Sequence, residues 1–177
     1  MGHGIAQVSA MSGYNVTLRD VEQQFLDKAM EKIKWSLDKL VSKQKLSQQE
    51  ADKILARITP KVDLADALKN CDLMIEAVPE IMELKKKVYA EVDKVADEKT
   101  VFASNTSTLP ITEIANTTSR PERFIGIHFF NPPQLMKLVE VIPGQRTSHE
   151  LVQTTIDFVN QFQKNQFCVK KTLQDLL

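Results

Sequence analysis

The chain alternates short apolar runs with longer amphipathic stretches, and this alternation restricts its fold more than any other feature. The clearest run, Asp72-Leu-Met-Ile-Glu-Ala-Val78, is almost continuously apolar, which is typical of a strand buried on both faces. Further strands are predicted at 15–19, 100–103, 124–130, 137–142 and 167–170, and helices at 21–46, 47–57, 83–97, 110–116 and 148–164. The opening segment suits a buried helix, and Gly13 suits its C-terminal stop. Strands that alternate with helices predict an α/β fold with a largely parallel sheet.

Two consecutive helices are predicted between residues 21 and 57. Apolar residues recur at steps of three and four along 21–46, and lysines fill much of the opposite face. Ser47-Gln-Gln-Glu50 matches a capping box and begins the second helix, and Pro60 closes the section. The pair is long for a plain crossover between two strands, so we expect it to project as an appendage.

Composition excludes several classes of protein. The 177 residues suffice for one full-sized domain with its own core. Lys plus Arg and Asp plus Glu both number 23, so the total charge gives no reason to expect nucleic acid or an anionic membrane as partner. Cys71 and Cys168 belong to no disulfide framework and to no metal-ligand pattern, so we expect no metal. No apolar run approaches the roughly 20 residues of a membrane span, and no signal peptide is recognisable, which predicts a soluble, cytoplasmic protein.

Candidate ligand-binding residues follow the predicted strands, because ligands of open α/β sheets bind at the carboxyl ends of strands. Asp20 ends the strand 15–19 and lies 18 residues after Gly2, close to the spacing at which an acid binds the adenosine ribose of a dinucleotide. The complete glycine fingerprint would need a strand and two further glycines before Met1. Asp20 as a plain surface turn residue is therefore the alternative.

His128 and Glu140 are candidates for acid–base chemistry. A histidine suits proton exchange near neutral pH, although a lone strand histidine is more often structural. In Lys137-Leu-Val-Glu-Val-Ile142 the side chains alternate, so Glu140 shares a face with Leu138 and Ile142. A carboxylate among apolar neighbours needs a partner, and an imidazole from the preceding strand is a plausible one. The alternative is an edge strand with Glu140 facing water.

Three further features carry weaker signals. Glu76 interrupts the apolar run 72–78 and raises the same question of a partner; we expect a structural role. Ser107 is one of several hydroxyls in the polar loop 104–108, and such loops are often plain turns. The lysines of the helix 31–45 form a solvated face or meet a phosphate-bearing ligand.

Five segments, taken in order, strongly resemble the 3-hydroxyacyl-CoA dehydrogenase family. They are Met1-Gly-His-Gly-Ile-Ala-Gln7, Ile75-Glu-Ala-Val-Pro-Glu80, Ser104-Asn-Thr-Ser107, Arg123-Phe-Ile-Gly-Ile-His-Phe-Phe-Asn-Pro132 and Met136-Lys-Leu-Val-Glu-Val-Ile142. The likeness covers roughly residues 1–170 and is to the N-terminal NAD-binding domain of the 3-hydroxybutyryl-CoA dehydrogenase-like members. It implies a Rossmann-like, doubly wound sheet.

The resemblance also implies roles for individual residues. His128 matches the catalytic base and Glu140 its carboxylate partner. Ser107 matches a serine that touches both the nicotinamide and the 3-oxygen of the substrate. The positions that match cofactor-binding residues are Gly2, Asp20, Glu80, Lys85, Ser107 and Asn131, and those that match coenzyme A contacts are Ser36 and Lys43.

The implied reaction is the reversible, NAD-dependent oxidation of a (3S)-3-hydroxyacyl-CoA to a 3-oxoacyl-CoA. An acid at position 20 favours NAD over NADP, because it would repel a 2′-phosphate, although the neighbouring Arg19 weakens this argument. The alternatives are a dinucleotide- or CoA-binding fragment without catalysis and another Rossmann oxidoreductase, such as a 6-phosphogluconate or 3-hydroxyisobutyrate dehydrogenase. Those two dehydrogenases rely on a lysine base, and the His-Phe-Phe-Asn-Pro block argues against them.

The chain also departs from the family pattern at both ends. The family begins with a strand and two glycines that have no counterpart here, and it continues into an all-helical domain that supplies dimer contacts and much of the acyl pocket. The segment Lys170-Lys-Thr-Leu-Gln-Asp-Leu-Leu177 does not match that continuation. Residues 1–177 are therefore expected to form a partial NAD-binding domain that lacks the first strand and has weak or no activity alone. A lost transit segment would make the mitochondrial matrix the alternative compartment.

Overall fold

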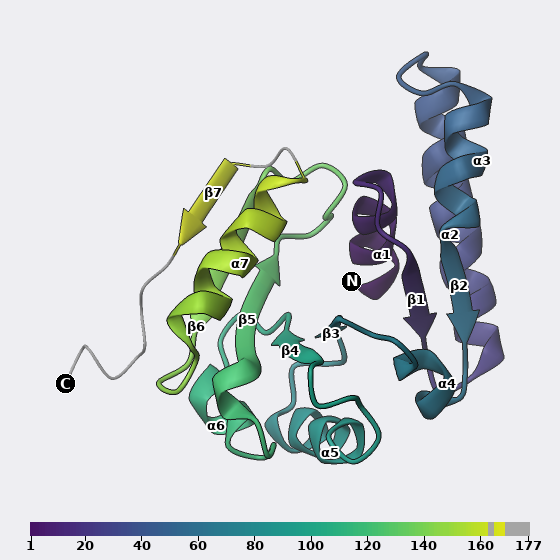
Figure 1. Ribbon diagram of the computed structural model, residues 1–177. Coiled ribbons are helices and arrows are strands. Elements are labelled where there is room, and N and C mark those ends of the chain that lie inside the picture. The colour runs from purple at the N-terminus through teal and green to yellow at the C-terminus, as the bar shows by residue number, and fades with distance from the viewer. Residues whose placement is uncertain (163–164, 169–177) are drawn as a thin grey trace. The chain divides into compact units, whose positions relative to one another are not determined.

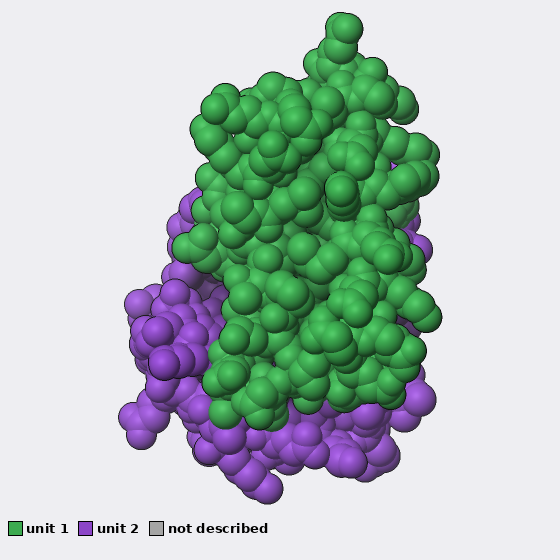
Figure 2. Space-filling view, turned by 90° about the vertical axis from the view of Figure 1, so that its right-hand side faces the viewer, with its two compact units in different colours: residues 1–67, 132–134 green, residues 68–131, 135–177 purple. Residues whose placement is uncertain are grey.

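The structure is a computed structural model that describes residues 1–162 and 165–168. The chain divides into two compact units, which Figure 2 shows in different colours. Unit 1 comprises residues 1–67 and 132–134, and unit 2 comprises residues 68–131 together with the chain from 135 onward.

Unit 1 is built mainly from helices around a two-stranded parallel sheet. Its elements are α1 (Gly2–Met11), β1 (Val16–Arg19), α2 (Gln23–Ser42), α3 (Gln48–Ala56), β2 (Ile58–Lys61) and α4 (Leu64–Leu68), the last of which ends at the boundary between the units. Strands β1 and β2 pair from Val16 opposite Ile58 to Arg19 opposite Lys61. The predicted stop at Gly13 is confirmed: its φ of +97° lies in the region that glycine adopts without strain.

The helical pair α2–α3 packs on α1 through a shared core. Ser47 begins α3 with the predicted capping box, because its side chain accepts from the Glu50 N–H while the Glu50 carboxylate accepts from the Ser47 N–H. The cluster that joins the helices to β2 consists of Ala6, Ala10, Ile33, Leu37, Ala51, Ile54 and Ile58. In Figure 1 the loop between α2 and α3 lies beyond the end of α1, so the pair is anchored at one end and extends past its neighbours at the other.

Unit 2 is a five-stranded sheet with helices. Its elements are β3 (Leu73–Glu76), α5 (Met82–Val92), β4 (Val101–Ser104), α6 (Ile111–Ala115), a 3-10 turn (Pro121–Arg123), β5 (Phe124–Phe129), β6 (Leu138–Pro143), α7 (His149–Asn160) and β7 (Asn165–Cys168). The strand order is β3-β4-β5-β6-β7, and only the pair β5–β6 is antiparallel. The mixed, mostly parallel α/β class is thus confirmed.

Aromatic side chains fasten α5 to the sheet of unit 2. Tyr89 is fully buried, packs edge-on against Phe124 with ring centroids 4.6 Å apart, and donates a hydrogen bond to the Ala103 carbonyl oxygen at 2.8 Å. Burial raises the pKa of the Tyr89 hydroxyl well above its ordinary value, so the hydroxyl remains a donor. This fixed helix supports the loop that follows β3.

Several boundaries differ from those predicted. Strand β2 and helix α4 were missed, because Pro60 reads as a strand breaker; here Pro60 lies in a strand that pairs with β1 alone among the described strands. Helices α2, α5 and α7 are shorter than predicted, and the predicted strand 167–170 is observed as Asn165–Cys168, with residues 169–170 outside the described part. No described helix is both long and apolar enough to cross a membrane.

Candidate active site in unit 2

His128 and Glu140 face each other across the antiparallel strands β5 and β6. They are direct register partners, and His128 Nδ1 lies 2.8 Å from Glu140 Oε2. The alternation expected for β6 is present, since Val139 and Val141 are buried while Glu140 occupies the other, half-buried face. Directly opposite residues of an antiparallel pair bring their side chains together, so the register alone explains the contact.

The contact with Glu140 selects which imidazole nitrogen of His128 is free to react. A carboxylate only accepts hydrogen bonds, so Nδ1 of His128 carries the donated proton and a neutral ring keeps its lone pair on Nε2. The side chain of His128 is 15% exposed and that of Glu140 27%, so solvent or a ligand has access to the pair. The His128 ring also packs against Phe130, with centroids 4.6 Å apart. The arrangement is that of an oriented general base.

The loop that carries Ser107 follows β4 and is held by Glu80. Glu80 Oε1 accepts hydrogen bonds from the Thr106 hydroxyl at 2.5 Å and from the backbone N–H groups of Ser107 and Thr108 at 2.8 Å and 3.1 Å. The Ser107 hydroxyl lies 3.3 Å from the same oxygen. Ser107 and Glu80 are both exposed, so they are open to a ligand.

The Glu80 carboxyl is strongly biased toward its ionised form. Partial burial alone would raise the pKa of Glu80, but the hydrogen bonds from Thr106, Ser107 and Thr108, together with the Lys85 charge, lower that pKa to about 2. Glu80 therefore carries a fixed negative charge beside the loop that contains Ser107.

Asn105 connects the serine loop to the histidine strand, a role the sequence reasoning missed. The Asn105 side-chain oxygen accepts a hydrogen bond from the Phe129 N–H at 2.8 Å, and the Asn105 N–H donates to the Glu76 carbonyl oxygen at 2.8 Å. Phe129 directly follows His128, so the amide holds the ends of β3, β4 and β5 together. The available signal was an asparagine immediately after a predicted strand, where side chains commonly hydrogen-bond free backbone groups.

Lys85 lies beneath Glu80 rather than at the surface. It is 1% exposed, and its Nζ lies 2.8 Å from Glu76 Oε1 and 3.3 Å from Glu80 Oε2. Of the residues matched to a cofactor site, unit 2 thus brings together Glu80, Lys85 and Ser107. Asn131 lies two residues beyond β5 and is exposed.

Unit 1 carries the other predicted ligand residues. Gly2 is the first residue of α1, where backbone N–H groups have no partner within the helix, and a Cβ at Gly2 would meet nothing within 4 Å. This open helix start suits a phosphate, and Asp20 is exposed at the carboxyl end of β1. These features fit the pyrophosphate and ribose of a dinucleotide.

Ser36 and Lys43 occupy α2 and its C-terminal cap in the same unit. They are seven residues apart, so they lie on one side of the helix two turns from each other. The Ser36 hydroxyl accepts a hydrogen bond from Gln7 at 3.0 Å, and Gln134 donates to Gln7 at 2.9 Å. Gln7, which is fully buried, was not singled out from the sequence.

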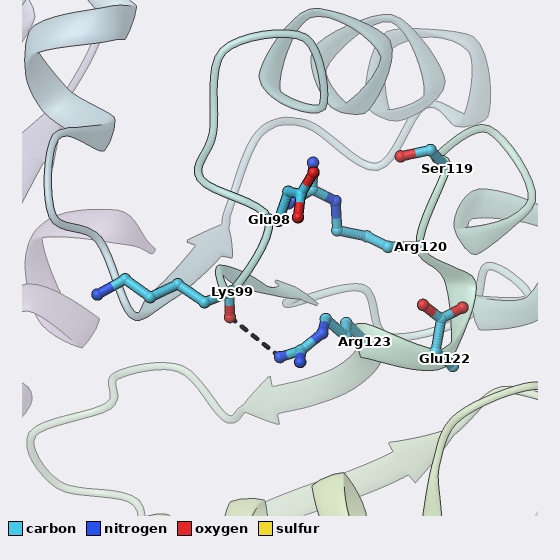
Figure 3. A pocket seen from close by; sticks show the side chains of 6 residues that line it. All are labelled: Glu98, Lys99, Ser119, Arg120, Glu122 and Arg123. Atoms are coloured by element: carbon cyan, nitrogen blue, oxygen red, sulfur yellow. Dashed lines mark hydrogen bonds between the residues drawn. The ribbon is translucent and has the colours of Figure 1, made fainter.

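An open pocket of about 570 Å³ in unit 2 contains none of the predicted site residues. Figure 3 shows its lining by Glu98, Lys99, Ser119, Arg120, Glu122 and Arg123. These residues precede β4 and β5, so the pocket lies at the amino ends of the strands, opposite to the usual ligand edge. Arg120 is already bound to Asp93 at 2.9 Å, and Arg123 donates to the Lys99 carbonyl oxygen at 3.2 Å. We assign this pocket a structural role.

Comparisons with known proteins identify the family of the chain. The sequence model of the family described as "3-hydroxyacyl-CoA dehydrogenase, NAD binding domain" matches residues 1–172. The mitochondrial hydroxyacyl-coenzyme A dehydrogenase of Rattus norvegicus is 40% identical over 177 residues, which covers 97% of this chain and 56% of the rat protein. A probable 3-hydroxybutyryl-CoA dehydrogenase of Deinococcus radiodurans is 41% identical over 164 residues, covering 93% of this chain and 58% of that protein.

A solved structure gives the same result for the fold. The crystal structure of an (S)-3-hydroxybutyryl-CoA dehydrogenase from Ralstonia eutropha matches with a TM-score of 0.94 and 40% identity, covering 97% of this chain and 60% of that one. The fold is therefore Rossmann-like. The chain spans little more than half the length of the curated relatives. It belongs to the family of NAD-binding domains of 3-hydroxyacyl-CoA dehydrogenases, and its cofactor is NAD.

Proposed function

We propose that this chain forms the NAD-binding, catalytic part of an enzyme that interconverts (3S)-3-hydroxyacyl-CoA and 3-oxoacyl-CoA. The observation that carries the proposal is the 2.8 Å contact between His128 Nδ1 and Glu140 Oε2, which leaves Nε2 as the proton acceptor. The Ser107 loop is tied to the same strand end through Asn105. Oxidation of a secondary alcohol requires a base that accepts the hydroxyl proton, and His128 supplies that base.

In the oxidation direction, His128 Nε2 takes the proton of the substrate 3-hydroxyl as the C3–O bond becomes a carbonyl. Glu140 stabilises the imidazolium that forms, which lowers the free energy of the charged intermediate state. The Ser107 hydroxyl orients the 3-oxygen. NAD⁺ supplies the acceptor for the hydride from C3. In the reverse direction His128 returns the proton to the 3-oxygen.

The residues proposed to hold the dinucleotide are those that match cofactor-binding positions of the family. In unit 1 they are Gly2 at the start of α1, which presents N–H groups to the pyrophosphate, and Asp20, which accepts from the adenosine ribose. In unit 2, Glu80, Ser107 and Asn131 are proposed to serve the nicotinamide end, with Lys85 buried behind Glu80 and out of direct contact with the ligand. Arg19 Nε donates one hydrogen bond to the Val62 carbonyl oxygen at 3.2 Å. Because the Asp20 carboxylate would repel a 2′-phosphate, we expect NAD to be preferred over NADP.

The acyl-CoA is proposed to contact Ser36 and Lys43 on α2. Lys43 is exposed, so its ammonium is available to a phosphate. Homodimerisation through a further, all-helical domain is part of the same proposal, as in the family that the sequence resembles. For the compartment we propose the cytoplasm, with the mitochondrial matrix as the alternative, since the rat relative is named as mitochondrial.

The test compares the unchanged protein with His128→Gln and Glu140→Gln. Reduction of acetoacetyl-CoA is followed by NADH absorbance, and the NADH dissociation constant by fluorescence. We expect His128→Gln to lower turnover by about 10²-fold or more and to leave the NADH affinity within about twofold, because general-base catalysis contributes roughly that factor. Equal turnover in His128→Gln and the unchanged protein would refute the assignment. Tight NADH binding without any turnover in the unchanged protein would favour a dinucleotide-binding module.

A further inference from the structure

Three charged side chains form a row beneath the Ser107 loop. Glu76 ends β3 and is wholly buried, Lys85 on α5 is 1% exposed, and the Glu80 side chain is 35% exposed. The Lys85 ammonium lies 2.8 Å from Glu76 Oε1 and 3.3 Å from Glu80 Oε2. The row thus runs from the core of unit 2 to its surface.

The Lys85 ammonium has no donor left for a ligand. It carries three N–H groups, and its three oxygen neighbours are Glu76 Oε1, Glu80 Oε2 and the Val78 carbonyl oxygen, the last at 3.3 Å. Because Lys85 is also 1% exposed, it cannot meet a bound molecule directly in this arrangement. Any effect of Lys85 on a ligand must pass through Glu80.

Glu76 is the counter-charge that permits a buried lysine at this place. Its Oε1 accepts from Lys85 and from the Val78 N–H at 2.6 Å, and its Oε2 accepts from the Ser104 hydroxyl at 2.8 Å. A buried ammonium without such a partner is strongly destabilising. The row contains two carboxylates and one ammonium, so one negative charge remains, and Glu80 presents it to the Thr106, Ser107 and Thr108 donors.

We propose that Lys85 is a positioning residue that acts through Glu80: anchored by Glu76, it holds the Glu80 carboxylate against the loop 106–108 and thereby fixes Ser107 where it meets the nicotinamide and the substrate oxygen. The placement of Ser107 at those groups rests on the proposed function. The hold on the loop rests on the contacts of unit 2 alone.

The decisive variant is the pair Glu76→Gln/Lys85→Met. Lys85→Met alone leaves a buried, unpaired carboxylate and is expected to unfold the protein. The pair removes both buried charges together and keeps similar volumes, so we expect it to fold. The matched control is Lys86→Met, which breaks an ion pair from the same helix to Glu113 at 2.7 Å, away from the loop. Circular dichroism and the melting temperature verify that each variant is folded.

Two readouts test the proposal in the complete protein. Amide hydrogen exchange of Ser107 and Thr108 is expected to accelerate about tenfold in the pair variant, because their acceptor loses its cation and shifts. The NADH dissociation constant is expected to rise about tenfold, while Lys86→Met changes neither quantity. A folded pair variant with unchanged exchange or with unchanged NADH affinity would overturn the proposal.

The His128→Gln assay separates this inference from the proposed function. If the unchanged protein binds NADH but does not reduce acetoacetyl-CoA, the proposed function fails while exchange and NADH affinity still decide the role of Lys85. If turnover depends on His128 but exchange in the pair variant is unchanged, the proposed function stands and the positioning role fails.

Discussion

At the scale of single residues, the site separates groups that meet a ligand from groups that hold those groups in place. In the proposed function His128 and Ser107 present the reactive atoms. Glu140 accepts a hydrogen bond from His128 and Glu80 accepts one from the Ser107 N–H, both at 2.8 Å, while Asn105 accepts at 2.8 Å from the N–H of Phe129, the residue after His128. Such acceptors restrict rotamers and backbone torsions before a ligand arrives, which lowers the entropic cost of assembling the site.

Glu80 makes the stability of unit 2 depend on pH in a definite direction. Its folded-state pKa of about 2 is below the usual 4.5, so its contribution to the free energy of unfolding is fully present above about pH 4.5 and is lost as the pH falls toward 2. In urea unfolding at several pH values, the stability difference between the unchanged protein and Glu80→Gln should therefore shrink below pH 4.5. Glu83→Gln, which removes another exposed carboxylate of unit 2, 3.4 Å from Lys86, is the control for the loss of one surface charge.

Asp20 provides a test of cofactor choice. Its exposed carboxylate would repel a 2′-phosphate, so replacement with serine should improve binding of NADPH relative to NADH. We expect the ratio of the two dissociation constants to change by about tenfold, equivalent to roughly 1.4 kcal/mol. Fluorescence titration with both dinucleotides measures the ratio. Asp27→Asn, at another exposed acid of unit 1, should leave it unchanged, and an equal shift in both variants would contradict the role of Asp20.

At the scale of elements, contact between α6 and the sheet leaves no space at Gly126. A Cβ on Gly126 of β5 would lie 2.8 Å from Ile111 Cδ1 and 2.9 Å from Ile142 Cβ. Ile111 starts α6, so this glycine sets how closely the helix approaches β5. Position 126 therefore requires glycine because Ile111 and Ile142 lie so close to it, and not because of its backbone torsion angles.

Gly126→Ala should lower the free energy of unfolding by about 1–3 kcal/mol, because the added methyl group overpacks a filled interior. Urea denaturation measures the change. The loss should be smaller when Ile111→Val is already present, since that variant removes the Cδ1 atom nearest to the new Cβ. Equal losses in both backgrounds would show that Ile111 is not the obstacle.

The sequence predicted elements best where a local pattern was sufficient. The strand in the apolar run 72–78, the capping box at Ser47 and the alternation around Glu140 each rest on neighbours in the chain, and each appears in the structure. The burial expected on both faces of that strand does not, because β3 is an edge strand of its sheet and its first three residues are half-buried. Strand β2 was missed because its central Pro60 conflicts with strand propensity, and pairing with β1 overrides that preference. The burial of Lys85 was also missed, because a charged helix gives no sign that a distant carboxylate at Glu76 will accept one of its lysines.

At the scale of the whole molecule, the division into two units does not follow the order of the chain. Residues 132–134 belong to unit 1, although β5 and β6 on either side belong to unit 2. No periodic pattern in the sequence indicates that residues 132–134 join unit 1, because this depends on contacts between residues more than 120 positions apart. Gln134 reaches Gln7 at 2.9 Å, and Pro133 packs over Gly4.

Gly4→Ala tests how strongly the stability of unit 1 depends on the packing of residues 132–134. A Cβ at Gly4 would lie 2.9 Å from Cδ of Pro133 and 3.1 Å from Oε1 of Gln134. Alanine gains up to about 1 kcal/mol in helix propensity, but the rigid proline ring cannot easily move, and overpacking costs about 1–3 kcal/mol. We therefore expect a net loss of about 1 kcal/mol in urea denaturation. When Pro133→Ala is also present, Gly4→Ala should instead raise the free energy of unfolding. If Gly4→Ala alone raised it, residues 132–134 would be shown to move aside at little cost.

The antiparallel register of β5 and β6 has a consequence for protein engineering. His128 and Glu140 meet because the two strands pair residue for residue, so the length of the connection between the strands does not enter their geometry. Extra residues grafted at Leu135, which is 76% exposed, should leave the pair coupled. One extra residue between Leu138 and Glu140 should instead turn the carboxylate to the opposite face of the sheet and disconnect it from the imidazole. The connection between β5 and β6 thus offers Leu135 for grafting a foreign loop, and β6 offers the segment between Leu138 and Glu140 for an insertion that separates the base from its carboxylate.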